Sequence, residues 1–172
     1  MKVFTPVDKE LADMIAEAFD NRWIDFYPRA GKTGGAFCME LLEERQSRVL
    51  TNFGGKFTDV MTLAHELGHA FHNLNLYDNP PLATSYSMPV AETASNFNEV
   101  VTMDYALKNA KSKAEKLTLL EGKISDTAQI ICDIYSRYLF EKSVIDSREE
   151  TFYNADGFAN LMIKAQKVSY GD

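Results

Sequence analysis

The chain has 172 residues, 45% of them hydrophobic, and a formal net charge of −7, so it lacks the basic surface that binds nucleic acid phosphates. It contains neither a signal-peptide core near its amino terminus nor a run of about eighteen apolar residues that could cross a membrane. Its length suits one domain, residues 1–172, and its two distant cysteines, Cys38 and Cys132, suit a reducing, cytoplasmic protein without a disulfide framework.

The first predicted helix begins at Thr5, which we expect to be its cap, with Pro6 in the first helical position, and it ends near residues 20–21. An irregular, aromatic-rich link follows at residues 23–28. Residues 29–35 are rich in glycine, which raises the possibility of a phosphate-binding loop. The spacing of a phosphate loop is absent and no clear helix follows, so the pattern favours a turn into a strand.

Two strands are predicted next, at residues 36–41 and 48–53, and they form a hairpin. A lone hairpin is only marginally stable, so we expect it to pack against the helix that follows. Its edge can then bind an extended peptide through main-chain hydrogen bonds, and Gly35, Ala36 and Phe37 are the candidate substrate-binding residues. A purely structural hairpin is equally compatible with the sequence.

The predicted helix at residues 57–74 carries the pattern His65-Glu66-Leu67-Gly68-His69. Residues four apart lie on one face of a helix, so His65 and His69 can ligate one metal ion. Glu66 is then placed to take a proton from water that the metal activates. A chance match on an exposed helix is the alternative. Against it, all three histidines of the chain lie in this stretch, and an apolar run precedes it.

A catalytic zinc ion usually has three protein ligands, and the third must come from elsewhere. His72 lies two turns beyond His65, too far to share the ion easily, so it is either a supporting residue or a packed histidine. The predicted helix at residues 90–108 offers two carboxylates on one face, Glu92 and Glu99. One would ligate and the other would orient a histidine, and spacing alone does not separate them.

The two stretches, residues 65–72 and 91–99, resemble the thimet oligopeptidase and oligoendopeptidase F family of zinc peptidases, and residues 23–25 and 31–37 are similar to its oligoendopeptidase F branch. The resemblance implies that Glu92 ligates zinc and that Glu99 supports the site. It implies a mainly helical (α+β), zincin-type catalytic domain with a small antiparallel hairpin or sheet beside the metal helix. Family members are longer than this chain, which ends at Tyr170-Gly171-Asp172, so we expect part of a catalytic domain.

The remaining sequence predicts helices. Apolar residues recur at helical spacing from about residue 112 to residue 146 and are expected to be ordinary core: Leu117, Leu120, Ile124, Ile131, Ile134, Tyr138 and Leu139. Asn154 or Asp156 is expected to cap a last helix.

The hypothesis from the sequence is an endopeptidase that holds one Zn²⁺ ion per chain and cleaves short peptides, with Glu66 as general base. The alternative is a metal-binding or peptide-binding fragment without turnover. A peptidase acting on one regulatory protein is a third, less favoured interpretation. Short peptides are the expected partners, with no nucleic acid and no membrane.

Overall fold

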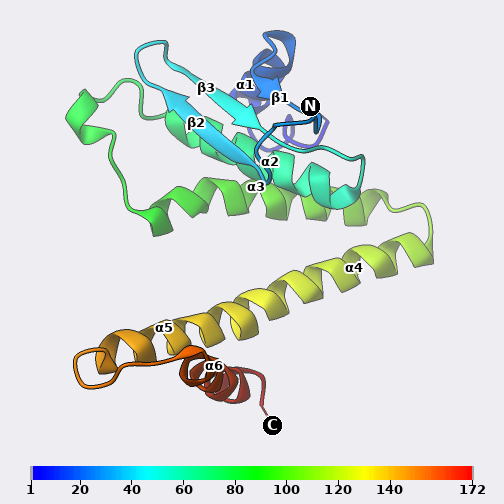
Figure 1. The fold of residues 1–172 in the computed structure, drawn as a ribbon. Coiled ribbons are helices and arrows are strands. Elements are labelled where there is room, and N and C mark those ends of the chain that lie inside the picture. Colours follow the sequence, from blue (N-terminus) through cyan, green and yellow to red (C-terminus); the bar gives the residue numbers. More distant parts are fainter. Residues whose placement is uncertain (1, 172) are drawn as a thin grey trace. The chain divides into compact units, whose positions relative to one another are not determined.

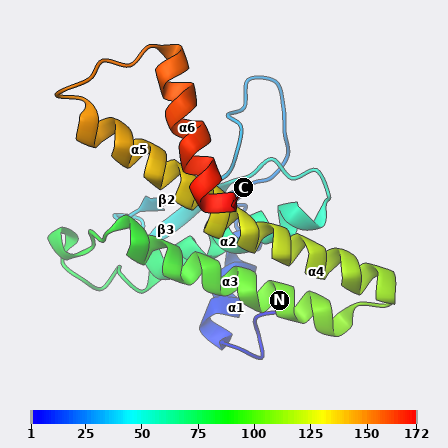
Figure 2. The same ribbon diagram turned by 90° about the horizontal axis from the view of Figure 1, so that it is seen from below.

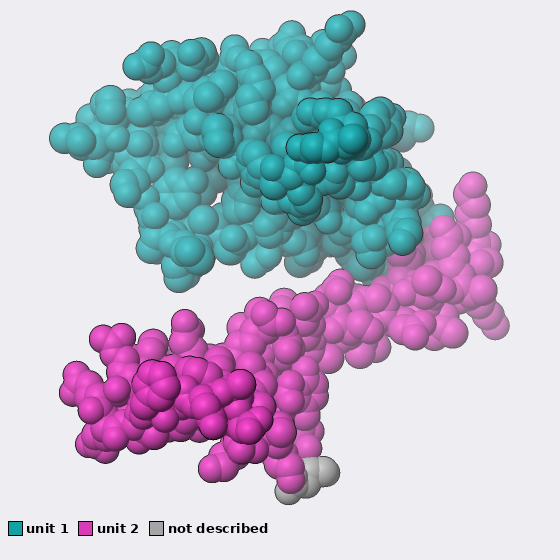
Figure 3. Space-filling model, viewed as in Figure 1, with its two compact units in different colours: residues 1–109 teal, residues 110–172 magenta. Residues whose placement is uncertain are grey.

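The structure is a computed structural model that describes residues 2–171, so Met1 and Asp172, the ends of the predicted single domain, lie outside the described residues. The chain divides into two compact units, residues 1–109 and 110–172, which Figure 3 distinguishes by colour. Each unit is described by itself. Across the described residues, every helix is too short or too polar to pass through a bilayer.

The first unit combines three α-helices with a small sheet (Figure 1). Its elements in chain order are α1 (Lys9–Asp20), β1 (Ile24–Asp25), β2 (Phe37–Leu41), β3 (Gln46–Leu50), α2 (Phe57–Leu74), the short 3₁₀ turn η1 (Pro81–Ala83) and α3 (Met88–Asn109). Helix α2 lies between the sheet and α3 and contacts both. The helix with the metal-binding pattern is therefore the central layer of the unit.

Helix α1 begins later than predicted. Asp8 is its N-cap, because the Asp8 carboxylate accepts a hydrogen bond from the Leu11 backbone N–H at 2.9 Å. The prediction of Thr5 as cap was wrong: a turn closed by the Phe4 carbonyl precedes the helix, and Asp8 has the extended backbone of a capping residue. The predicted end near residues 20–21 is confirmed.

The predicted hairpin is confirmed, with β2 and β3 antiparallel and Cys38 opposite Val49. Strand β3 begins two residues before the predicted start, because the turn at residues 42–45 places Gln46 directly opposite Leu41. The sequence did not predict β1, which pairs in parallel with β3. The sheet order is β1-β3-β2, so β2 is an edge strand of the described sheet.

Apolar side chains from α1, the sheet and α2 form the core of the first unit. The buried members are Phe4, Leu11, Ala12, Met14, Ile15, Ala18, Ile24, Val49, Leu63, Ala64, Leu67 and Ala70. Helix α2 begins at Phe57 and ends at Leu74, as predicted. The side chains on the sheet-facing side of α2 lie in this core, and a different face of α2 contacts α3.

The second unit is a run of helices: α4 (Lys113–Ala128), a π-helical turn η2 (Gln129–Ile134), α5 (Tyr135–Ser147) and α6 (Ala155–Tyr170). Figure 1 shows α4, η2 and α5 as one continuous rod, and Figure 2 shows α6 crossing this rod, where it packs against α5 and η2. The Asn154 side chain caps α6 by accepting a hydrogen bond from the Gly157 backbone N–H at 2.9 Å, as predicted. The π-helical turn was not predicted.

The expectation of ordinary core along this rod was wrong. Leu117 is 67% exposed and Ile124 is 68% exposed, whereas the side chains that are buried along the rod are Leu119 and Ser136. Helical spacing shows which residues share a face, but it does not show whether another element covers that face.

Candidate metal centre

Helix α2 presents both histidines of the pattern on one face. The rings of His65 and His69 meet edge to face with their centroids 4.8 Å apart, and their Nε2 atoms are 3.2 Å apart. Both side chains are partly buried. Glu66, between them in sequence, is only 7% exposed. One turn of helix therefore provides two converging nitrogen atoms that could ligate a metal, with a buried carboxylate beside them.

Helix α3 supplies the third group. The Oε2 atom of Glu92 lies 3.2 Å from Nε2 of His65 and 3.6 Å from Nε2 of His69. These three residues form a group whose potential ligand atoms all lie within 4.8 Å of one another. Ligand atoms about 2.0–2.1 Å from a tetrahedral zinc ion lie about 3.3 Å from each other. The spacing in the protein therefore fits one ion held by two imidazoles and one carboxylate.

The close approach of α2 and α3 depends on Gly68. A Cβ atom on this residue would lie 2.5 Å from the Ser95 Cα atom and 2.6 Å from the Ala94 carbonyl oxygen. Both contacts are with the backbone of α3, which cannot move aside as a flexible side chain can. Asn98, which is 1% exposed, fixes the same contact by donating from Nδ2 to the Ala64 carbonyl of α2 at 3.1 Å.

Each of the three candidate ligands has a partner of its own. Nδ1 of His65 donates to Oε1 of Glu99 at 2.5 Å, because an ionised carboxylate can only accept, and this leaves the lone pair of Nε2 free for a metal. His69 makes a hydrogen bond with the Ala91 backbone. The Ser95 hydroxyl donates to Oε2 of Glu92 at 2.7 Å. The side chains are thus held in orientations suited to ligation.

The ionisable groups differ in their electrostatic surroundings. The hydrogen bond to Glu99 raises the pKa of His65, although burial opposes this. Burial, and then the neighbouring His65, lower the pKa of His69, which favours the neutral form that binds metals. Burial raises the pKa of Glu66, although His65 opposes this.

The structure keeps His72 outside the group of candidate ligands. Its ring packs against the Tyr86 ring at a tilt of 34° with centroids 4.3 Å apart, and the Tyr86 hydroxyl donates to Oδ1 of Asn73 at 3.1 Å. Among the described residues, its buried Nδ1 atom has no hydrogen-bond partner. A direct ligand role for His72 is therefore not supported, in agreement with the distance argument from the sequence.

The three candidate substrate-binding residues lie where the glycine-rich loop enters β2. Gly35 has a φ of +79°, in the left-handed region, and Phe37 is the first residue of the strand. The next residue, Cys38, faces α2. Burial raises its pKa to about 12, opposed by a hydrogen bond with Ser47, and the nearby Glu66 carboxylate adds to the increase. The start of the edge strand thus lies in the neighbourhood of Glu66.

The glycine-rich loop is not arranged to bind phosphate. The Lys32 side chain is 1% exposed, and its ammonium group is occupied by backbone carbonyls of the protein. The favoured interpretation, a turn into a strand, is confirmed.

Sequence reasoning missed the residues that set the distance between the two helices. Gly68, Ser95 and Asn98 carry no metal-binding signal of their own. The one signal available was Gly68 itself, because a glycine inside a helix is unfavourable unless close packing requires it.

Comparison with known proteins shows that this chain is similar to peptidases. Residues 2–161 match the family described as peptidase family M3. The chain is 31% identical to oligopeptidase PepF of Bacillus subtilis over 121 residues, which are 70% of this chain and 18% of that protein. It is 33% identical to the chromosomal oligoendopeptidase F of Lactococcus lactis over 155 residues, 90% of this chain and 24% of that protein. The chain thus spans about a quarter or less of the length of these relatives.

A solved structure of PZ peptidase A with an inhibitor superimposes with a TM-score of 0.79, at 19% sequence identity, over 96% of this chain and 29% of that one. At this identity the likeness concerns the fold. It agrees with the mainly helical fold and small sheet that the sequence predicts.

Proposed function

The chain belongs to peptidase family M3, and from this premise we propose that it carries the metal site of an endopeptidase that cleaves short peptides. The predicted resemblance to the oligoendopeptidase F branch is confirmed by the relatives found. The observation that carries the proposal is the convergence of two imidazole nitrogens and one carboxylate oxygen, 3.2–3.6 Å apart, beside a buried glutamate.

His65, His69 and Glu92 would hold the ion, and this mixed nitrogen and oxygen donor set is one that zinc accepts. When bound, the ion supplies Lewis-acid chemistry, which polarises a peptide carbonyl and makes water more acidic. Glu66 acts as general base: its carboxylate takes a proton from the attacking water and passes it to the leaving nitrogen. Glu99 keeps the proton of His65 on Nδ1. The free thiols of Cys38 and Cys132 suit a cytoplasmic setting.

The experiment is an assay of the chain on fluorogenic short peptides, with zinc and with a chelator. We expect that the chelator stops cleavage and that added zinc restores it. Cleavage that persists in chelator would contradict the proposal. Because the chain spans about a quarter or less of its relatives, a second function fits the same site, namely binding of metal and peptide without turnover. Bound zinc and bound peptide without cleavage would identify that function.

Replacing Glu99 with Ala is expected to weaken zinc binding about 10- to 100-fold, because His65 loses the carboxylate that orients its ring. Competition with a chromophoric chelator measures the affinity. Asp104→Ala is the matched control, since Asp104 is an exposed carboxylate on the same helix, paired with Lys108. Equal zinc affinity in Glu99→Ala and the parent would rule out the supporting role.

A further inference from the structure

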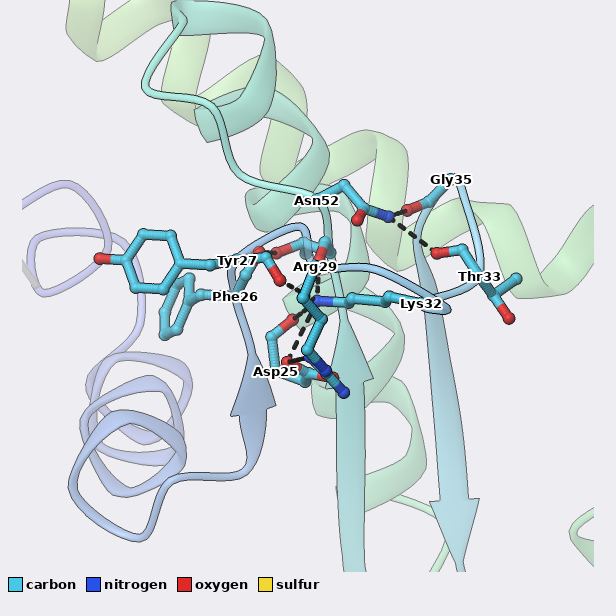
Figure 4. Close-up of polar contacts among 9 residues, drawn as sticks. Asp25, Phe26, Tyr27, Arg29, Lys32, Thr33, Gly35 and Asn52 are labelled. Atoms are coloured by element: carbon cyan, nitrogen blue, oxygen red, sulfur yellow. Dashed lines mark hydrogen bonds and ion pairs between the residues drawn. The ribbon is translucent and has the colours of Figure 1, made fainter.

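Lys32 is a cation buried at the end of the sheet. Its side chain is 1% exposed, and Nζ donates to the carbonyl oxygens of Asp25 at 3.0 Å, Tyr27 at 2.9 Å and Thr51 at 2.6 Å (Figure 4). It also forms an ion pair with the Asp25 carboxylate at 3.1 Å. All of its donor capacity is therefore used within the protein, and none remains for a ligand.

These contacts connect three segments that are separate in sequence. Asp25 ends β1, Thr51 follows β3, and Lys32 itself belongs to the loop that leads to β2. Arg29, an exposed residue at the start of the same loop, pairs with the same Asp25 carboxylate at 2.7 Å. The hydrogen bonds from Arg29 and then Lys32 lower the pKa of Asp25 to about 2, so this carboxylate remains charged in neutral solution. The Lys32 ammonium group thus links the loop to the ends of β1 and β3, which are parallel strands.

Asn52 fixes the remaining part of the same loop. Its Nδ2 atom donates to the Thr33 carbonyl at 3.0 Å and to the Gly35 carbonyl at 2.9 Å, and Figure 4 shows the side chain reaching across to both. Gly35 has a positive φ, and Phe37 begins the strand two residues later. Lys32 and Asn52 thus hold the loop directly before the first residue of β2.

The start of β2 matters because this strand is an edge strand and lies against the metal-binding helix. Its outer edge is unpaired among the described residues, and its inner face contacts α2 near Glu66. An unpaired strand edge binds an extended peptide by main-chain hydrogen bonds. A peptide bound in this way has its position relative to the metal set by the position of the strand.

We propose that Lys32 and Asn52 are positioning residues for an extended peptide substrate. They hold residues 33–37 so that the free edge of β2 presents its main-chain groups at the right place beside the site formed by His65, His69 and Glu92. This inference rests on the proposed function and deepens it. Neither residue touches the peptide; both act through the strand.

The test measures peptide binding in the complete chain, loaded with zinc and carrying Glu66→Gln to prevent cleavage. The probe is a fluorescein-labelled heptapeptide, compared with a labelled dipeptide that is too short to run along β2. Asn52→Ala is expected to weaken heptapeptide binding about three- to tenfold, the range for loss of one or two neutral hydrogen bonds. Dipeptide binding and zinc affinity are expected to remain at the parent level. A general loss of structure would change all three measurements together.

Asn109→Ala is the matched control. Asn109 also donates its amide to a backbone carbonyl, that of Tyr105, but it does so at the end of α3, away from the loop. Lys32→Met is a second variant, expected to weaken heptapeptide binding more strongly if its circular dichroism shows a folded chain. Asn52 is only partly buried, so the test does not depend on the lysine variant.

The outcomes separate the two proposals. If the parent chain binds zinc and heptapeptide, and Asn52→Ala binds both equally well, the positioning role is wrong and the proposed function stands. If the zinc-loaded parent binds no heptapeptide, the proposed function fails, and the positioning role fails with it. Selective loss of the longer peptide supports both.

Discussion

Replacing Glu66 with Gln is expected to abolish peptide cleavage while leaving zinc bound. Glu66 is 7% exposed and is not one of the three proposed metal ligands, so its replacement leaves the three ligand atoms in place. Glutamine has nearly the same shape, but its amide cannot take a proton from water. Loss of a general base lowers turnover by about 10²–10⁴-fold. Steady-state kinetics on a fluorogenic peptide, together with zinc analysis of the purified protein, measure both effects.

The control for this variant is Glu43→Gln, which makes the same chemical change in the exposed turn between β2 and β3. It is expected to cut peptides at the rate of the parent. A Glu66→Gln chain that cuts as fast as its parent would show that another group takes the proton. A Glu66→Gln chain that lacks zinc would instead show that Glu66 supports the metal site itself.

Replacing Gly68 with Ala is expected to damage both the fold of the first unit and its metal site. The added Cβ atom would meet the Ser95 Cα atom at 2.5 Å, the Ala94 carbonyl oxygen at 2.6 Å and the Ala94 carbonyl carbon at 2.8 Å. Relief requires α3 to move away from α2, which carries Glu92 away from the two histidines. Overpacking of this kind costs about 1–3 kcal/mol, against a gain in helix propensity of about 1 kcal/mol. We therefore expect net destabilisation and zinc affinity at least about tenfold weaker.

Urea unfolding and zinc competition test this expectation. Gly122→Ala is the matched control, because Gly122 lies within α4 and an added Cβ atom there would meet nothing within 4 Å. That change is expected to stabilise the protein by up to about 1 kcal/mol. A Gly68→Ala chain as stable as its parent, with unchanged zinc affinity, would mean that the two helices tolerate a wider separation.

The sequence predicted the candidate site best where the residues lie on a single helix. Helical spacing alone places His65 and His69 on one face, and the structure has α2 at the predicted residues. The choice between Glu92 and Glu99 lay beyond spacing, because it depends on the height and rotation of α3 against α2. Those are set by Gly68 and by the hydrogen bond from Asn98, which are contacts between elements. The resemblance to a family favours Glu92 as the ligand, a choice that local physics left open.

Two features of the fold could not be predicted from the sequence for a related reason. Strand β1 is only two residues long, too short to show an alternating pattern, and it forms because Lys32 and the backbone of β3 hold it. The apolar stripe of α4 was predicted from its spacing, but its exposure was not, since spacing carries no information about neighbours.

The most direct test of the whole account is anomalous diffraction at the zinc edge from crystals of the chain soaked in zinc. We expect one strong peak per chain, about 2.0–2.2 Å from Nε2 of His65, from Nε2 of His69 and from a carboxylate oxygen of Glu92. A peak held by other residues, or no peak at these three side chains in crystals shown to contain zinc, would contradict the metal centre on which the proposed function rests.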